Sequence, residues 1–165
     1  MELTIVKARR VDREAWEALF LQHCHRFGAP DMDRATLDVL WERIHDPAHP
    51  MTGWVALADG ARLVGIAHTI LHPHTFSLRS VCYLEDIWVD EDARGGGIGS
   101  AIIDHLVATG RAEDWERIYW ITGRDNEDAH RLYDRIAKRT DYTLYHLDLA
   151  PQPALHGAGG EHRGD

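Results

Sequence analysis

Residues 94–100 read RGGGIGS, with four glycines between an arginine and a serine. Each glycine forgoes apolar burial and raises the entropy lost on ordering, so a run this dense is expected where backbone geometry or close approach matters. The preceding stretch VCYLEDIWV (81–89) alternates and is rich in β-forming residues, whereas SAIIDHLVATG (100–110) has helical periodicity and is expected to end at Gly110. The glycines therefore join a strand to a helix.

This loop suits a phosphate ligand. A helix N-terminus offers unpaired N–H groups and a partial positive charge, and glycines let a phosphate come within hydrogen-bonding distance. A P-loop is excluded because the sequence contains no Gly-Lys pair. The dinucleotide pattern Gly-x-Gly-x-x-Gly fails because its sixth position is Ser100 counted from Gly95 and Ile102 counted from Gly97. The loop thus predicts another kind of phosphate site, with a purely structural turn as the alternative.

Composition limits the class of protein. The 165 residues suit one domain, with 44% hydrophobic and 27% charged residues. No apolar run approaches the ~20 residues of a membrane span, and MELTIVKARR (1–10) lacks the apolar core of a signal peptide, so we expect a cytoplasmic protein. The net charge of −9 argues against nucleic acid and suits a cationic substrate, although solubility alone also explains it.

Cysteines and histidines give no sign of a metal centre. Cys24 and Cys82 are compatible with reduced thiols, and Cys24 is expected in the core. Two histidine pairs have a one-residue spacing without carboxylate or cysteine partners, which is a weak signal: His23 with His25, and His72 with His74. We therefore predict no metal site.

The remaining patterns predict a single mixed domain. Strands are expected at 3–9, 53–58, 62–72, 81–89, 117–122 and 142–149, and helices at about 12–28, 33–44, 100–110 and 126–138. Asp12 is expected to cap the first helix, and Asp59-Gly60 to form a hairpin turn. The order indicates an α/β fold with an α+β mixed sheet over residues 1–149, followed by a disordered tail at 150–165.

The loop also matches a family pattern. Arg94, Gly97 and Gly99 occupy the fixed positions of Arg/Gln-x-x-Gly-x-Gly/Ala, the pyrophosphate loop of the GNAT superfamily of acyl-CoA N-acyltransferases, which this sequence resembles. NEDAHRLYD (126–134) is similar to the Asn-x-x-Ala-x-x-Leu/Phe-Tyr pattern of that superfamily, and residues 83–100 look like its polyamine and small-amine branch. The resemblance implies a GNAT-like fold: a central, mostly antiparallel, splayed sheet with about four helices.

Family resemblance also implies acetyl-CoA as co-substrate. The backbone of Ile87, Trp88 and Val89 would pair with the pantetheine amides, while Asn126 would hold the same arm from the opposite side. The pyrophosphate would lie against Arg94, Gly95, Gly96, Gly97, Ile98, Gly99 and Ser100. Several basic residues could lie near the 3′-phosphate or simply form a solvated helix face: Arg124, Arg131, Arg135, Lys138 and Arg139.

Two residues are candidates for proton transfer. An amine of pKa ~10.4 is mostly protonated at neutral pH, so an acidic group must accept its proton. Glu85 is the candidate because its strand leads into the phosphate loop, although it could be an ordinary exposed carboxylate; Asp86 should face the opposite side unless a β-bulge intervenes. Tyr133, from the helix pattern, is the candidate general acid for the leaving thiolate, or else a half-buried aromatic residue.

Together with the family resemblance, these residues predict an N-acetyltransferase that acts directly on a small, cationic primary amine such as a polyamine, amino acid or amine antibiotic. Acetylation of a protein lysine or N-terminus, and a CoA-binding regulatory module without catalysis, are the alternatives. No nucleic-acid or membrane partner is expected, and the resemblance suggests a homodimer.

Overall fold

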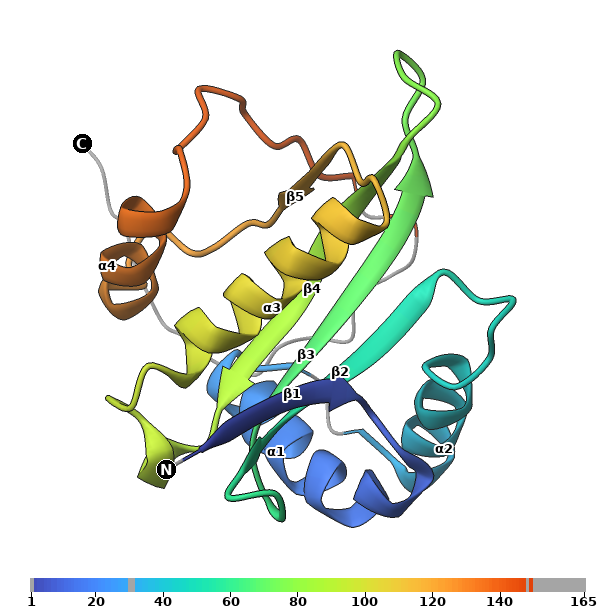
Figure 1. Ribbon diagram of the computed structural model, residues 1–165, viewed down its shortest axis with the longest axis vertical. Coiled ribbons are helices and arrows are strands. Elements are labelled where there is room, and N and C mark those ends of the chain that lie inside the picture. The colour runs from blue at the N-terminus through green and yellow to red at the C-terminus, as the bar shows by residue number, and fades with distance from the viewer. Residues whose placement is uncertain (1, 30–31, 148, 150–165) are drawn as a thin grey trace, which may run out of the picture. The chain divides into compact units, whose positions relative to one another are not determined.

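A computed structural model describes residues 2–29, 32–147 and 149 (Figure 1). The chain forms two compact units, Met1–Asn126 and Glu127–Asp165. Within the described residues, the first unit contains all the strands and three α-helices, and the second contains α4 (Glu127–Ile136). The tail expected at 150–165 lies outside the described residues.

The first unit is built on one mixed sheet. Its strands, in chain order, are β1 (Leu3–Lys7), β2 (Met51–Ala58), β3 (Arg62–Pro73), β4 (Ser80–Val89) and β5 (Arg117–Tyr119). They lie side by side in the same order; the first four are antiparallel, and β5 pairs parallel to β4. Asp59 and Gly60 both have positive φ between β2 and β3, which confirms the predicted hairpin turn. The mixed, mostly antiparallel sheet that the sequence predicts is thus confirmed.

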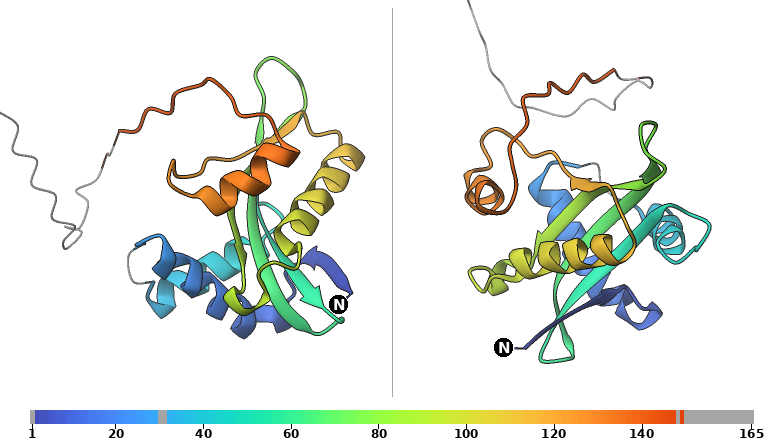
Figure 2. Two further views of the ribbon diagram at one scale, coloured as in Figure 1. Left: turned by 90° about the vertical axis from the view of Figure 1, so that its left-hand side faces the viewer. Right: turned by 45° about the horizontal axis from the view of Figure 1, so that its top comes forward.

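Helices cover both faces of this sheet. On one face, α1 (Arg13–Arg26) and α2 (Arg34–Arg43) bury Trp16 and Trp41 against Val55 and Ile66, whereas α3 (Ile98–Ala112) lies on the other (Figure 2). Cys24 belongs to the α1 core, as predicted. Both faces of β2 and β3 are buried, which explains why these strands read as continuous apolar runs rather than as alternating ones.

Helix α3 packs closely on the sheet at Gly65 of β3, which has no side chain. A Cβ placed on Gly65 of β3 would lie 3.1 Å from both Ile98 and Ile102 of α3. Glycine at this position therefore lets the helix that follows the glycine loop approach the sheet closely.

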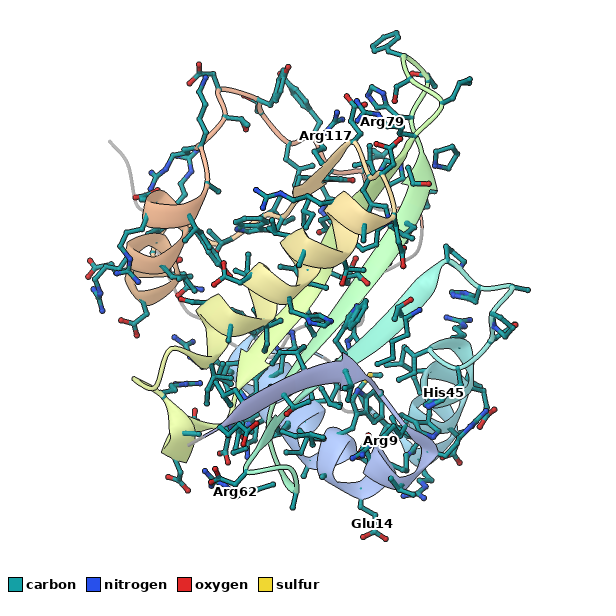
Figure 3. All side chains as sticks on the ribbon, viewed as in Figure 1. Arg9, Glu14, His45, Arg62, Arg79 and Arg117 are labelled. Atoms are coloured by element: carbon teal, nitrogen blue, oxygen red, sulfur yellow. The ribbon has the colours of Figure 1, made fainter. Side chains whose placement is uncertain are left out.

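The short β5 is held at the beginning of β4. The Glu116 N–H donates to the Ser80 carbonyl over 2.8 Å, and the Glu116 carboxylate lies 3.1 Å from Arg79 and 3.8 Å from Arg117. Arg79 and Arg117 lie together near the turn between β3 and β4 (Figure 3). This ion-pair group positions β5 beside the first residues of β4.

Several predicted boundaries are wrong. Helix α3 continues past Gly110 to Ala112, because Gly110 is buried against Trp115, whose ring a Cβ would approach to 2.8 Å. Asp12 is the N-cap residue of α1, as predicted, but its side chain makes no capping hydrogen bond; its carboxylate accepts the Arg9 N–H instead. The strand expected at 117–122 ends at Tyr119.

The last predicted strand is also wrong in its described part. Residues 142–147 have no regular secondary structure, and Tyr142, Leu144, Tyr145 and Leu147 are exposed. Alternating apolar residues form a strand only where a neighbouring strand offers backbone partners. The helix predicted at 126–138 is confirmed as the slightly shorter α4.

Candidate active site

The glycine loop has the backbone that the sequence predicts. Gly95 and Gly97 have φ of +83° and +75°, and a Cβ on either would meet no protein atom within 4 Å. Conformation, not crowding by the protein, therefore requires glycine at these two positions. The space beside both backbones is open to a ligand.

The loop leads directly into the N-terminus of α3. Gly97 is the N-cap residue, and the Ala101 N–H is the first to bond back to its carbonyl, at 3.0 Å. The N–H groups of Ile98, Gly99 and Ser100 in the first turn therefore have no partner within the helix. The first turn carries no acidic residue, and no side chain caps it. Such a terminus fits an anionic group like the pyrophosphate of CoA.

Arg94 packs back onto the sheet. Its guanidinium carbon lies 4.5 Å from the centre of the Trp88 ring, and its Nη2 lies 3.6 Å from Glu91. The Trp88 indole in turn donates to Gln22 of α1 over 3.1 Å. Arg94 thus anchors the start of the loop to β4, and its contact with pyrophosphate stays a prediction.

Strand β4 has an edge that is only partly covered. β5 pairs only with Val81, Cys82 and Tyr83, so within the described chain no strand pairs with residues 84–89 on that edge. On the opposite edge, Ile87, Trp88 and Val89 pair with Ala67, Ile66 and Gly65 of β3. An open strand edge offers N–H and C=O groups to an extended ligand. The pantetheine arm, which carries two amides, fits this edge.

Glu85 lies at a β-bulge. Thr69 of β3 pairs with Leu84 and the adjacent His68 with Asp86, so Glu85 is the extra residue of β4. Glu85 is exposed as a residue, but its carboxylate is partly shielded from water. This partial burial, and after it the negative charge of Asp86, raises the pKa of Glu85. A carboxylate with a raised pKa at a bulge beside an open edge is suited to accept a proton.

The bulge also decides where Asp86 lies, which the sequence left open. Both Asp86 carboxylate oxygens are hydrogen-bonded at 2.8 Å, one to His23 of α1 and the other to His68 of β3. Sequence analysis missed this cluster. His23 is 63 residues away from Asp86 in the chain, and no local spacing signals such a contact.

The two remaining site candidates are Asn126 and Tyr133. Asn126 is the last residue of the first unit, and its side-chain amide donates to Thr122 over 3.3 Å. Tyr133 lies on α4 in the second unit, and burial raises the pKa of its phenol, which keeps it protonated at neutral pH. Because Glu85 and Tyr133 belong to different units, their meeting in one site stays a prediction.

Two of the five basic residues considered for the 3′-phosphate form ion pairs inside the second unit. Arg131 pairs with Asp128 on α4, and the Arg139 guanidinium lies 2.9 Å from Asp134. These contacts favour the solvated helix face for Arg131, whereas Arg139 lies beyond the end of α4.

Neither metal nor membrane features occur in the described part of the chain. Among those residues, no three of the His, Cys, Asp and Glu side chains gather as a metal site would require. His72 instead contacts the Tyr119 hydroxyl at 3.1 Å. None of the described helices is long and apolar enough to cross a bilayer.

Known proteins resemble the chain in sequence and in structure. D-amino-acid N-acetyltransferase HPA3 of Saccharomyces cerevisiae is 28% identical over 135 residues, which cover 81% of this chain and 83% of that protein. A crystal structure of a probable acetyltransferase superposes with a TM-score of 0.80 at 26% identity, covering 89% of this chain and 98% of that one. The structure of AAC(6')-Iy with a CoA-containing bisubstrate analogue has a TM-score of 0.76 at 18% identity, covering 91% and 100%, and shows likeness of fold alone.

The family model for the acetyltransferase (GNAT) family matches residues 12–137. This range includes α1, the β4 bulge, the glycine loop and α4. The chain therefore belongs to the acetyltransferase (GNAT) family.

Proposed function

We propose that this N-acetyltransferase transfers the acetyl group of acetyl-CoA directly to a primary amine of a small, cationic acceptor. The observation that carries the proposal is the run from the open edge of β4 into the glycine loop, with Glu85 at the bulge. The family uses acetyl-CoA, and this run offers backbone partners for the pantetheine arm followed by unpaired N–H groups for the pyrophosphate.

In this proposal, the reaction needs two proton transfers. Glu85, directly or through water, accepts a proton from the ammonium, and the free amine then attacks the thioester carbonyl. A C–N bond forms and the C–S bond breaks. Tyr133 protonates the leaving thiolate and regains its proton from the acetylated nitrogen through solvent. The products are the amide, CoA thiol and one proton released to solvent.

Charge supports a cationic acceptor. The net charge is −9, and Asp90, Glu91 and Asp92 lie immediately before the glycine loop. A negative field raises the local concentration of a cation. The similarity to a D-amino-acid N-acetyltransferase and the polyamine-like stretch 83–100 support amino acids and polyamines as candidate acceptors.

The direct test is release of CoA thiol from acetyl-CoA with a panel of amines. The panel contains spermidine, lysine, both enantiomers of several amino acids, an aminoglycoside and a histone-tail peptide. Turnover with a small amine and none with the peptide supports the proposal. Turnover with the peptide alone would favour a protein acceptor, and tight acetyl-CoA binding without turnover would favour a CoA-binding module.

A further inference from the structure

Four side chains form a buried chain of hydrogen bonds beside the bulge. The Trp16 indole N–H donates to His68 Nε2 over 2.9 Å, and His68 Nδ1 lies 2.8 Å from one Asp86 oxygen. His23 Nε2 lies 2.8 Å from the other oxygen. This series of hydrogen bonds therefore joins α1, at two positions, to β3 and β4. His68 is only 1% exposed and does not contact solvent.

The hydrogen-bond donors of this network determine which nitrogen of His68 carries the proton. An indole N–H can only donate, so His68 Nε2 must accept and its proton must be on Nδ1, facing Asp86. Although burial alone would raise the pKa of Asp86, the hydrogen bonds from His23 and His68 hold it far below its ordinary value. Asp86 is thus a buried carboxylate anion with both oxygens occupied.

We propose that Asp86, held by His23 and His68, is a positioning residue that locks the β4 bulge and so fixes the direction and electrostatic surroundings of Glu85. The inference rests on the proposed role of Glu85 as proton acceptor. His68 pairs with Asp86 at the point where the register shifts, so the network fastens the residue immediately after the bulge. A β-bulge can change the direction of a side chain. Here the buried hydrogen bonds from His68 of β3 and His23 of α1 hold the bulge in place.

The network also keeps a negative charge next to Glu85. Among the described residues, the charged and titratable groups that interact with Glu85 are Tyr83 and Asp86 on β4 and His68 on β3, with His23 of α1 beyond Asp86. The negative charge of Asp86 makes Glu85 a better proton acceptor. Neutralising Asp86 should therefore lower the proton affinity of Glu85.

A double-mutant cycle tests this inference. Asp86→Asn should reduce kcat/KM for the amine by on the order of 10-fold or more in the wild-type background, but by less than about 2-fold in Glu85→Gln, because coupled residues are not additive. In a ¹³C NMR titration, Asp86→Asn should also move the midpoint of Glu85 to lower pH. This second measurement needs no turnover, so it tests the inference even if every amine fails and the proposed function is wrong.

Matched variants separate positioning from folding. Asp12→Asn is the control, since Asp12 is another buried carboxylate whose two oxygens accept hydrogen bonds, at 2.8 and 2.7 Å from Arg9, and it lies outside the Asp86 network. This variant should lower the Tm while leaving kcat/KM within about 2-fold and the Glu85 midpoint unchanged. His23→Gln, whose amide can replace Nε2 as a donor, should retain more activity than His23→Leu, and this pair decides the question if Asp86→Asn fails to fold.

Equal losses from Asp86→Asn in both backgrounds, with an unmoved Glu85 midpoint, would overturn the inference and leave the network a purely structural role. So would equal activity of His23→Gln and His23→Leu.

Discussion

The candidate site depends on a few residues whose backbone or surroundings are unusual. Gly95 and Gly97 have a left-handed backbone, and Glu85 is the extra residue of a bulge. The sequence indicates the two glycines and Glu85 as site candidates, because glycine density and a carboxylate ahead of a phosphate loop are local signals, but it does not predict the bulge. It could not predict the partners of Asp86, because His23 and His68 reach it only through tertiary packing.

Glu85→Gln should lower kcat/KM for the amine by on the order of 10²-fold, because the amide cannot accept the proton. Since burial and Asp86 raise the pKa of Glu85, the wild-type rate should fall with decreasing pH at a higher pH than the ordinary glutamate value of ~4.3 would give. A pH profile of kcat/KM, measured with an amine of low pKa, checks both. An unchanged profile in Glu85→Gln would assign proton acceptance to another group.

Gly97→Ala should weaken acetyl-CoA binding and destabilise the protein by roughly 1 kcal/mol, because alanine is strained at its φ of +75°. Gly60→Ala is the matched control, since Gly60 has a φ of +77° with similarly open surroundings but lies in the hairpin between β2 and β3. Calorimetric titration with acetyl-CoA and thermal unfolding separate the two effects. Equal affinity in both variants would argue against a ligand at the loop.

Strong local sequence patterns predicted most helices and strands correctly, whereas contacts between distant residues could not be predicted. The Asp33 carboxylate caps α2 by accepting the Thr36 N–H over 2.7 Å, and strand β4, the loop and α3 follow in the predicted order. The predicted end of α3 failed because Trp115 packs on Gly110. The strand predicted at 142–149 failed in its described part because alternation cannot reveal whether a partner strand is present.

The hydrogen bonds of Asp86, which connect α1, β3 and β4, should make the stability of the protein depend on pH. The pKa of Asp86 is depressed in the folded state, so its contribution is present above the unfolded value of ~3.9 and is lost as pH falls below that value. Thermal unfolding between pH 6 and pH 3 should show a Tm decrease larger by about 5 °C in the wild type than in Asp86→Asn. Parallel Tm curves for the two proteins would mean that Asp86 is not held as described.

Considered as a whole, the molecule is strongly acidic, with 27 Asp and Glu against 18 Lys and Arg. Its family and mixed sheet agree with what the sequence predicts, because the loop and its flanking elements make up a large part of that fold. The acceptor could not be predicted from sequence, since its specificity depends on how side chains from several elements come together.

If the acidic charge attracts the acceptor, kcat/KM for spermidine should fall severalfold between 50 mM and 500 mM salt, because screening shortens the reach of the field. A monoamine of lower charge measured in parallel should lose less. Equal salt dependence for both amines would leave solubility as the role of the net charge.

Tyr133→Phe gives the most direct test of the central claim, the direct transfer of an acetyl group from acetyl-CoA to an amine with Tyr133 as the general acid for the leaving thiolate. With the best amine of the panel, kcat should fall by on the order of 10²-fold while the Kd for acetyl-CoA stays within about 2-fold. An unchanged kcat would contradict the claim, because a phenylalanine has no proton to give to the thiolate.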